Sequence, residues 1–318
     1  MIRRRPLLAA SLLLPAAARA QPGPGRPVRI IVPFAAGGPT DLIARLAAAQ
    51  LEQGWGQPVV VENRPGAGGS TGSAAVARAA PDGLTLLVTA NSHVINPAVL
   101  RSLPFDTLAD FTPIIRLADG PFVMVAHPAM GVRDLAGFLA AVRARPGHYN
   151  YGSPGHGTGN HLAMERLIGL GGLRMTHVPY GGAAPATTAL LSGEVQVLIN
   201  NLPNSLPHIA EGRMVPLGIG SLAPAPVLPN LPPIATTFPG FTAENWYAVF
   251  APAGLDPERA EAIHAAAARA MRSAAVLERL GPLGITPAAG PRADFARQVA
   301  EEVAEWRRVA RAAGIEPG

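Results

Sequence analysis

The chain has 318 residues, no cysteine, and 26 basic against 21 acidic side chains. Without cysteine it can form neither a disulfide nor a thiolate metal site, and it offers no residue for a lipoprotein anchor. Four arginines fall within the first 20 residues, and without them 22 basic residues face 21 acidic ones, a net charge of +1. So balanced a charge gives no indication of nucleic-acid binding.

The first 20 residues have the pattern of a cleavable signal peptide. A basic start at Arg3, Arg4 and Arg5 precedes an apolar run over 7–18, and Ala18-Arg19-Ala20 predicts cleavage before Gln21. We therefore expect export to the periplasm, by the general secretory route or, given the arginine pair, by the twin-arginine route. No later stretch is long and apolar enough to predict a membrane span.

The rest of the chain alternates short β-branched runs with segments of helical periodicity, which predicts an α/β fold with mixed, mainly parallel sheets and flanking helices. The expected strands are 28–32, 59–62, 85–88, 111–117, 122–126, 150–151, 175–178, 195–199, 215–219 and 246–250. The expected helices are 40–55, 70–79, a short polar one within 96–110, 135–145, one opening after 159, 185–191, 206–211, 257–271 and 292–313.

About 298 residues remain after the signal peptide, enough for two domains by the usual size. We expect the chain to cross between them near Gly120-Pro121 and again before Trp246. Domain one then comprises 21–121 plus 246–318, and domain two comprises 122–245. Two crossings make a hinge, which suits a protein that closes on a ligand.

Two glycine-rich turns stand out, each after an expected strand and before an expected helix. The first is PFAAGGPTD at 33–41 and the second is GSPGHGTG at 152–159. Gly37 and Gly38 permit backbone angles that other residues avoid, and Thr40 can cap the helix. A helix start attracts anions through its free N–H groups and dipole. We interpret the two turns as facing each other across a cleft and holding a small carboxylate.

These motifs also carry a resemblance to a known family. Both turns, with VENRPGAGG at 61–69, PDGLTLL at 81–87, LPFD at 103–106 and HVPYG at 177–181, resemble the Bug-type periplasmic solute-binding receptors of tripartite tricarboxylate transporters. The resemblance implies a two-lobed, type II-like binding-protein fold. It also implies a monomer without a cofactor, which binds a small organic anion (a carboxylate or an amino acid) and delivers it to membrane permease subunits in separate chains.

The resemblance implies a set of residues that hold the ligand carboxylate. Backbone N–H groups or hydroxyls would be supplied by Ala36, Gly37, Gly38, Ser153, Gly157 and Thr158. The sequence departs from the family at 199–201, where Ile-Asn-Asn replaces a common Phe-Asp-Asn. Because the amide of Asn200 does not repel an anion, a second ligand carboxylate could be tolerated there.

Three further candidate site residues are suggested by where they stand relative to the expected strands and helices. Phe34 and Asn91 follow expected strands, where they can line a cleft. Asp41 could contact a ligand amine, or simply be a favourable acid in a first helical turn. Ser153 and Thr158 could likewise be only turn and helix caps. The chain has no lysine, and the arginines nearest the turns, Arg45 and Arg166, should point away from the helix starts, so we expect no arginine on the ligand.

The alternative interpretation is an α/β enzyme, a hydrolase or dehydrogenase, acting on a small organic acid. A dinucleotide-binding turn at 66–72 would need a third glycine where Thr71 stands. A serine nucleophile at Ser153 would need glycine where Tyr151 stands. His156 and His161 are five apart, which does not place both on one helix face. We therefore expect no catalytic residue and no metal site.

Overall fold

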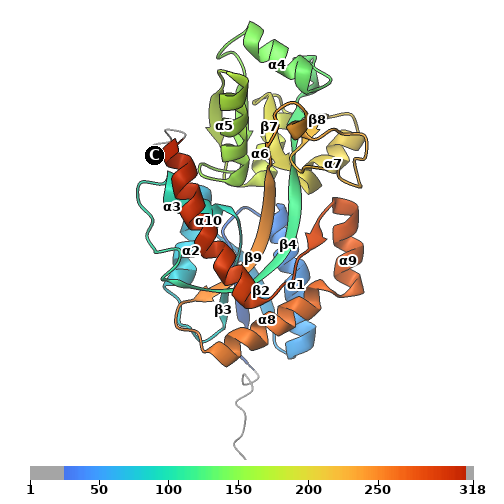
Figure 1. Cartoon of the computed structure of the whole chain (residues 1–318). Helices are drawn as coiled ribbons and strands as arrows, with labels where there is room; N and C mark the ends of the chain where they lie inside the picture. The colour runs from blue at the N-terminus through green and yellow to red at the C-terminus, as the bar shows by residue number, and fades with distance from the viewer. Residues whose placement is uncertain (1–24, 313–318) are drawn as a thin grey trace, which may run out of the picture.

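A computed structural model of the chain describes residues 25–312, which form two lobes, one above the other in Figure 1. The expected signal peptide over residues 1–20 lies outside this range. Within 25–312 no helix combines the length and the apolar content needed to cross a membrane.

The lower lobe is built on a mixed sheet. Its strands follow the order β2 (Val59–Asn63), β1 (Val28–Val32), β3 (Thr85–Ala90), β9 (Glu244–Pro252), β4 (Phe111–Ala126) and β10 (Thr286–Pro287). β1, β2, β3 and β4 run in one direction, while β9 and β10 run in the other. The β1–β3 unit has the strand–helix–strand alternation expected from the sequence.

The upper lobe contains a second mixed sheet, which shares β4 with the first. Its order is β8 (Val215–Ile219), β4, β7 (Val197–Asn201), β5 (Asn150–Ser153) and β6 (Thr176–Pro179). β8, β7, β5 and β6 share one direction and β4 opposes them. The predicted α/β architecture with two mixed sheets is therefore confirmed, but the expectation that they are mainly parallel is wrong, because β4 and β9 make antiparallel pairs with their neighbours.

The expectation of two separate strands at 111–117 and 122–126 is wrong, because both belong to the single strand β4. Up to Pro121 this strand pairs with β9, and from Phe122 onward it pairs with β7. A proline is tolerated at a point where one partner strand replaces another. β4 and β9 are thus the strands that link the two lobes in Figure 1.

Helices cover both faces of the lower sheet. α1 (Pro39–Trp55), α8 (Pro257–Met271) and α9 (Ala274–Leu280) pack on one face with Ile30 and Val32 of β1. α2 (Ser70–Ala77), α3 (Ser92–Val99) and α10 (Arg292–Ala312) pack on the other face, where Ile31 points. This alternation along β1 is what a strand buried on both faces requires.

The upper sheet is also covered on both faces. α4 (Leu135–Ala144) and α5 (Gly159–Gly171) pack with Phe122 and Met124 of β4. α6 (Ala183–Leu191) and α7 (Leu202–Ala210) pack with Val123 and Val125 on the opposite face. Short 3-10 helices complete the described chain at Ala67–Gly69, Pro128–Met130, Ile234–Thr236 and Gly281–Leu283.

Helix α3 begins earlier than expected from the sequence, at Ser92 rather than within 96–110. Pro97 lies inside it and cannot donate a hydrogen bond to the carbonyl of His93, four residues earlier. The hydroxyl of Thr107 donates to that carbonyl instead, at 3.4 Å. The chain therefore tolerates proline here because a side chain supplies the missing donor.

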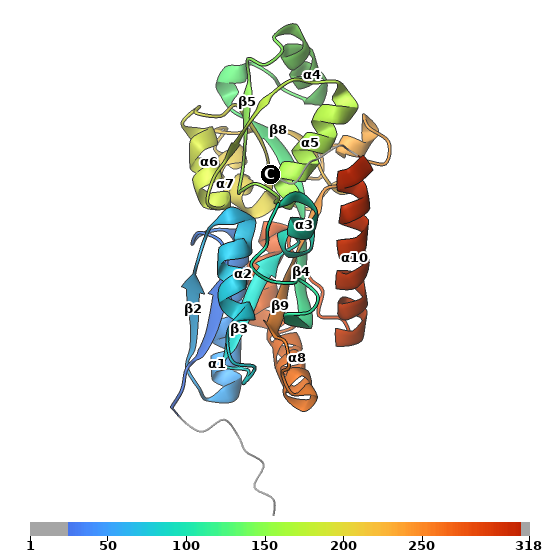
Figure 2. The same ribbon diagram turned by 90° about the vertical axis from the view of Figure 1, so that its left-hand side faces the viewer.

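Glycines and apolar side chains are among the groups through which the two lobes touch. The Ala35 N–H donates to the Gly181 carbonyl, 3.3 Å away, and the backbone of Gly182 lies against Ala35. Leu162 of α5 belongs to the same apolar cluster as α3 and α10 of the lower lobe. Figure 2 shows α10 lying along the lower lobe and reaching the level of α5. The two lobes are therefore in direct contact in this structure.

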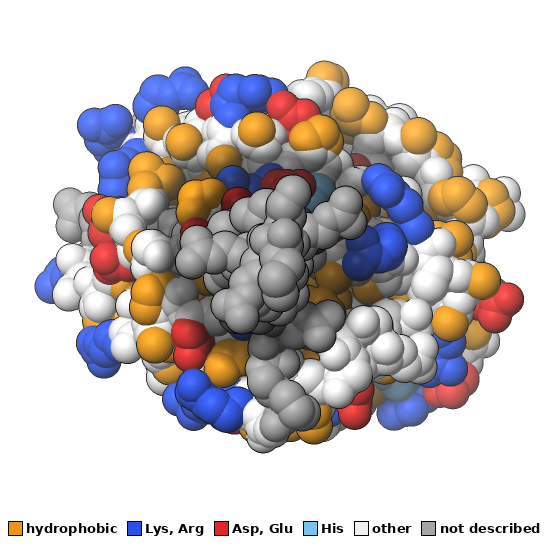
Figure 3. All heavy atoms as spheres, turned by 90° about the horizontal axis from the view of Figure 1, so that it is seen from below, with side chains coloured by type: hydrophobic (Ala, Val, Ile, Leu, Met, Phe, Trp, Pro, Cys, Tyr) orange, Lys and Arg blue, Asp and Glu red, His pale blue; other side chains and the backbone are white. Residues whose placement is uncertain are grey.

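Charged side chains on the lower face are dispersed. Seen from below, basic and acidic side chains lie among apolar ones and do not gather into one patch of a single sign (Figure 3). This distribution agrees with the nearly balanced charge of the sequence after residue 20.

Candidate functional site

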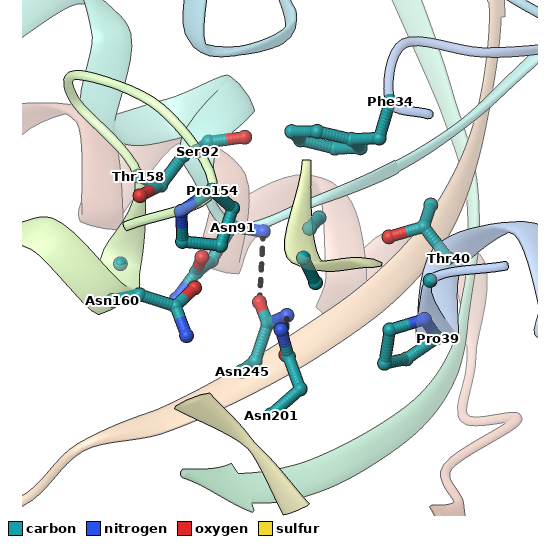
Figure 4. A pocket seen from close by; sticks show the side chains of 14 residues that line it. Phe34, Pro39, Thr40, Asn91, Ser92, Pro154, Thr158, Asn160, Asn201 and Asn245 are labelled. Carbon is teal, nitrogen blue, oxygen red and sulfur yellow. Dashed lines mark hydrogen bonds between the residues drawn. The ribbon is translucent and has the colours of Figure 1, made fainter. Parts of the chain in front are cut away.

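An open cavity lies where the two lobes meet, and the space between its atoms, together with its solvent-facing part, amounts to about 370 Å³. Its walls come from both lobes and from β9, as Figure 4 shows. Among the described residues it is lined by Phe34, Gly38, Pro39, Thr40, Ala90, Asn91, Ser92, Pro154, Thr158, Gly159, Asn160, Ala183, Asn201 and Asn245. None of these side chains carries a charge, while seven have a hydroxyl or an amide.

The N-termini of five helices meet at this cavity. Gly38 is the N-cap of α1, Asn91 of α3, Thr158 of α5 and Asn201 of α7, while Ala183 is the first residue of α6. The first N–H groups of a helix have no partner within the helix, and its N-terminus carries a partial positive charge. The cavity is thus electropositive without containing a cationic side chain.

Asp41 stabilises the first glycine turn from within. Its carboxylate accepts hydrogen bonds from the Gly37 N–H at 3.1 Å, from Asn63 Nδ2 at 2.9 Å and from Arg45 Nε at 3.0 Å. Burial alone would raise the pKa of this carboxyl, but these hydrogen bonds outweigh it, so the pKa is lowered. Asp41 is therefore ionised, and its carboxylate is already hydrogen-bonded within the protein. The Gly37 N–H is directed at Asp41 rather than at the cavity.

The two hydroxyls of the second glycine turn converge on a single carbonyl. Ser153 Oγ donates to the Gly155 oxygen at 2.9 Å, and Thr158 Oγ1 donates to the same oxygen at 2.8 Å. Thr158 Oγ1 also accepts from the His161 N–H, at 3.4 Å, as an N-cap. Neither hydroxyl proton is directed at the cavity in this arrangement.

Asparagines form the floor of the cavity, near β9. Asn245 Oδ1 accepts from the backbone N–H of Asn91 at 3.3 Å, the dashed line in Figure 4, and Asn245 Nδ2 lies 3.4 Å from Asn201 Oδ1. Asn201 Oδ1 also accepts from the hydroxyl of Tyr247, at 3.2 Å. Within residues 25–312 the Nδ2 group of Asn201 has no hydrogen-bond partner, so this donor is left for a ligand.

The structure brings four of the predicted site residues into the cavity wall: Phe34, Gly38, Asn91 and Thr158. It places six others outside the lining, namely Ala36, Gly37, Asp41, Ser153, Gly157 and Asn200. Gly157 packs instead against Asn96 and Val99 of the opposite lobe. The glycine turns nevertheless contribute half of the lining, namely Phe34, Gly38, Pro39, Thr40, Pro154, Thr158 and Gly159.

Asn200 lies inside the upper lobe. Its Nδ2 group donates to the hydroxyl oxygens of Thr187 and Ser205, both at 3.0 Å, and its Oδ1 atom accepts from the Asn201 N–H. The neighbouring Asn201 is the residue that reaches the cavity. The departure from the family pattern at position 200 therefore alters this internal network and not the cavity wall.

Both arginines near the turns contact other groups. Arg45 pairs with Asp41 at 3.0 Å, and Arg166 donates to the Gly240 carbonyl at 2.8 Å while lying over the ring of Phe241. Neither lines the cavity. The polar groups of the lining are therefore helix ends, hydroxyls and amides rather than guanidinium groups.

Ten lining residues were not among the predicted site residues: Pro39, Thr40, Ala90, Ser92, Pro154, Gly159, Asn160, Ala183, Asn201 and Asn245. Asn201 and Asn245 come at the end of β7 and the start of β9, where the chain approaches the boundary between the lobes. A polar residue next to each expected crossing strand was the signal that could have found them.

The comparisons with known proteins agree with this geometry. The model of the family described as the tripartite tricarboxylate transporter family receptor matches residues 43–315. Protein BugT of Bordetella pertussis is 36% identical over 294 residues, which are 92% of this chain and 90% of BugT.

Two solved relatives share the fold closely. An R. palustris protein solved with adipate is 34% identical with a TM-score of 0.89, over 93% of this chain and 100% of that one. MatC from Rhodopseudomonas palustris, solved with bound malate, is 34% identical with a TM-score of 0.85, over 90% and 99%. The family consists of transport receptors, which excludes the hydrolase and dehydrogenase alternatives. The chain belongs to the family of receptors of tripartite tricarboxylate transporters.

Proposed function

We propose that this receptor binds a small dicarboxylate in the cavity between its lobes and delivers it to membrane permease subunits made from separate chains. The observation that carries the proposal is the convergence of five helix N-termini on a cavity whose lining has no charged side chain. The two relatives solved with adipate and malate, both dicarboxylates, support the same ligand class.

The charge of such a ligand matches the field of the cavity. Each helix N-terminus is equivalent to roughly half a positive charge, so five of them are comparable to the two negative charges of a dicarboxylate. α1 and α3 belong to the lower lobe, whereas α5, α6 and α7 belong to the upper one. This division suits a ligand with a carboxylate at each end and an aliphatic chain against Phe34, Pro39 and Pro154.

An amino acid suits the cavity less well. Its ammonium group needs an anionic partner, and no carboxylate lines the cavity. Asp41, the predicted partner for a ligand amine, is engaged by Arg45, Asn63 and the Gly37 N–H. We therefore expect discrimination against zwitterions.

Titration calorimetry with matched ligands tests this function. Succinate, malate, glutarate and adipate should include a saturable 1:1 binder, while the corresponding neutral diamides should not bind. Glutarate should bind more tightly than glutamate, which differs from it by one amino group. Binding confined to neutral sugars or to diamines would overturn the proposal.

We further propose that ligand capture involves rotation of a domain of residues 21–121 plus 246–318 against a domain of residues 122–245. β4 and β9 cross between them, and β4 carries register shifts near Pro113, Arg116 and Met124 that can absorb bending. Small-angle scattering should show a smaller radius of gyration with saturating ligand than without it. An unchanged radius would contradict the hinge.

The comparisons support a periplasmic location, and we propose that residues 1–20 direct export and are removed. Mass spectrometry of the periplasmic fraction should find an N-terminus at Gln21. Arg4→Lys together with Arg5→Lys should stop export only if the twin-arginine route is used.

We also propose a monomer, which size-exclusion chromatography with light scattering would show as a single species near the mass of one chain.

A further inference from the structure

Three histidines outside the carboxylate cavity converge beneath the second glycine turn. His156 lies in the turn, His161 in the first turn of α5, and His177 in β6. One ring nitrogen from each lies within 4.8 Å of those of the other two. The ring centroids of His161 and His177 are 4.0 Å apart, and those of His156 and His161 are 4.7 Å apart.

This cluster could not be predicted from residue spacing, for two structural reasons. His156 precedes α5, so helical spacing does not govern where its ring lies relative to His161. His177 comes from β6, which pairs with β5 in the sheet beside the turn. The cluster arises from the packing of a strand against a helix start, which spacing alone does not reveal.

Each imidazole, in its neutral form, can offer the lone pair of one ring nitrogen to a metal ion.

A neighbouring hydroxyl holds one of the rings in place. Because the Ser153 hydroxyl gives its proton to Gly155, it accepts one from His177 Nε2, 2.7 Å away, which leaves the His177 Nδ1 lone pair free. A polar partner of this kind orients metal-binding histidines.

We propose that His156, His161 and His177 form a binding site for a divalent transition metal ion such as Zn²⁺ or Ni²⁺. Three imidazoles suit these ions and do not suit Mg²⁺ or Ca²⁺, which prefer oxygen ligands. His156 and His177 are partly exposed, which gives the ion access and leaves room for a water ligand. None of the three lines the carboxylate cavity, so the two sites are separate.

Metal binding requires the rings to turn and to approach one another, because His161 and His177 are stacked at an interplanar angle of 19°. With Zn–N bonds of about 2.0 Å, tetrahedral ligand nitrogens lie about 3.3 Å apart, closer than the 4.8 Å limit found here. His156 can move inward because it is partly exposed and lies in the turn. At His161 Nδ1 the ion replaces the hydrogen bond that the Gly157 N–H donates, at 3.3 Å.

The proposal is tested with untagged mature protein stripped of metal by a chelator. Calorimetry should show one Zn²⁺ or Ni²⁺ bound per chain with a Kd of about 10 µM or tighter, and no binding of Mg²⁺. His156→Gln, which changes a partly exposed side chain, should weaken binding at least ~10-fold. His148→Gln, an exposed histidine of the same lobe, is the matched control and should leave binding unchanged.

X-ray absorption of the zinc-loaded protein gives an independent measurement that does not depend on folding of the variants. It should show three imidazole ligands and a light atom. Equal affinity of His156→Gln, His177→Gln and the native chain for Zn²⁺ would overturn the proposal, as would a spectrum without several imidazoles. Dicarboxylate binding by the native chain is a separate measurement, so failure of either site is distinguishable from failure of the other.

Discussion

The side-chain oxygen of Asn245 accepts a hydrogen bond from the backbone N–H of Asn91, with 3.3 Å between the two atoms. Asn245 lies on β9, which runs between the lobes, and its amide nitrogen approaches Asn201 of the upper lobe at 3.4 Å. Asn91 is the N-cap of α3 in the lower lobe. One residue on a crossing strand thus links the cavity walls of both lobes.

Asn245→Asp should weaken dicarboxylate binding, because aspartate has the same shape as asparagine but adds a negative charge to the cavity. Two unit charges 4 Å apart repel by about 4 kcal/mol at an effective dielectric constant of 20, so we expect a loss of at least ~100-fold in calorimetry. Asn230→Asp adds the same charge at an exposed position and should have little effect. Equal losses in both variants would show that the anion does not lie beside Asn245.

The local parts of the fold could be predicted because local chemistry determines them. A glycine turn after each expected strand marked the starts of α1 and α5, and Pro257 marked the start of α8. By contrast, the continuity of β4 depends on which strands pair on either side of Pro121. That pairing joins residues far apart in the chain and is not encoded in the Gly120-Pro121 pair itself.

The cavity was harder to predict than the fold. The glycine turns were correctly recognised as helix starts, yet the hydroxyls of Ser153 and Thr158 are directed at Gly155. Asn245 reaches Asn91 across 154 positions of the sequence, so no local pattern identifies it. Side-chain direction within a turn depends on competing internal acceptors, which appear only after the chain has folded.

Arg45→Ala and Arg166→Ala should each change ligand affinity less than about threefold. Neither side chain lines the cavity, and charges at that distance act mainly on the association rate. Calorimetry at physiological salt gives the affinities, and stopped-flow binding gives the rates. A loss above tenfold in either variant would mean that an arginine moves onto the ligand when it binds.

Thr158→Ala should lower stability more than affinity. The hydroxyl caps α5 and donates to Gly155, and loss of a threonine cap costs about 1 kcal/mol. Urea unfolding without ligand should show this loss, and Thr158→Ser should recover most of it. Affinity should fall less than ~10-fold, since the hydroxyl proton is not directed at the cavity. A large affinity loss at unchanged stability would indicate direct contact with the ligand.

Gly159→Ala should hinder closure of the lobes. A Cβ atom there would lie 2.8 Å from both amide atoms of Asn91, which a hydrogen bond to the Glu244 carbonyl holds in place. We expect at least ~10-fold weaker binding and a larger radius of gyration with ligand present. Gly169→Ala is the control in the same helix, because a Cβ there meets nothing within 4 Å. It should leave binding intact and raise stability by about 0.5–1 kcal/mol.

The burial of the His93 ring predicts how the stability of the folded protein depends on pH. Its ring is fully buried against Phe105, Phe111 and Phe250, and neither ring nitrogen has a hydrogen-bond partner within residues 25–312. Burial lowers its pKa from 6.5 to about 3. Below pH 6.5 the unfolded chain therefore binds one proton more than the folded chain at this residue.

The direction in which stability changes with pH follows from that proton difference. Stability should fall as pH drops from 6.5 toward 3, and His93 should contribute about 1.4 kcal/mol per pH unit, or about 2 kcal/mol between pH 6.5 and 5. His161 and His177 act in the same direction.

Urea unfolding at pH 7, 6 and 5 should show that His93→Leu reduces the slope of unfolding free energy against pH by one proton. Phe111→Leu disturbs the same aromatic cluster without removing a titrating group, so it should lower stability equally at every pH. Identical slopes in the two variants would mean that His93 is protonated in the folded protein.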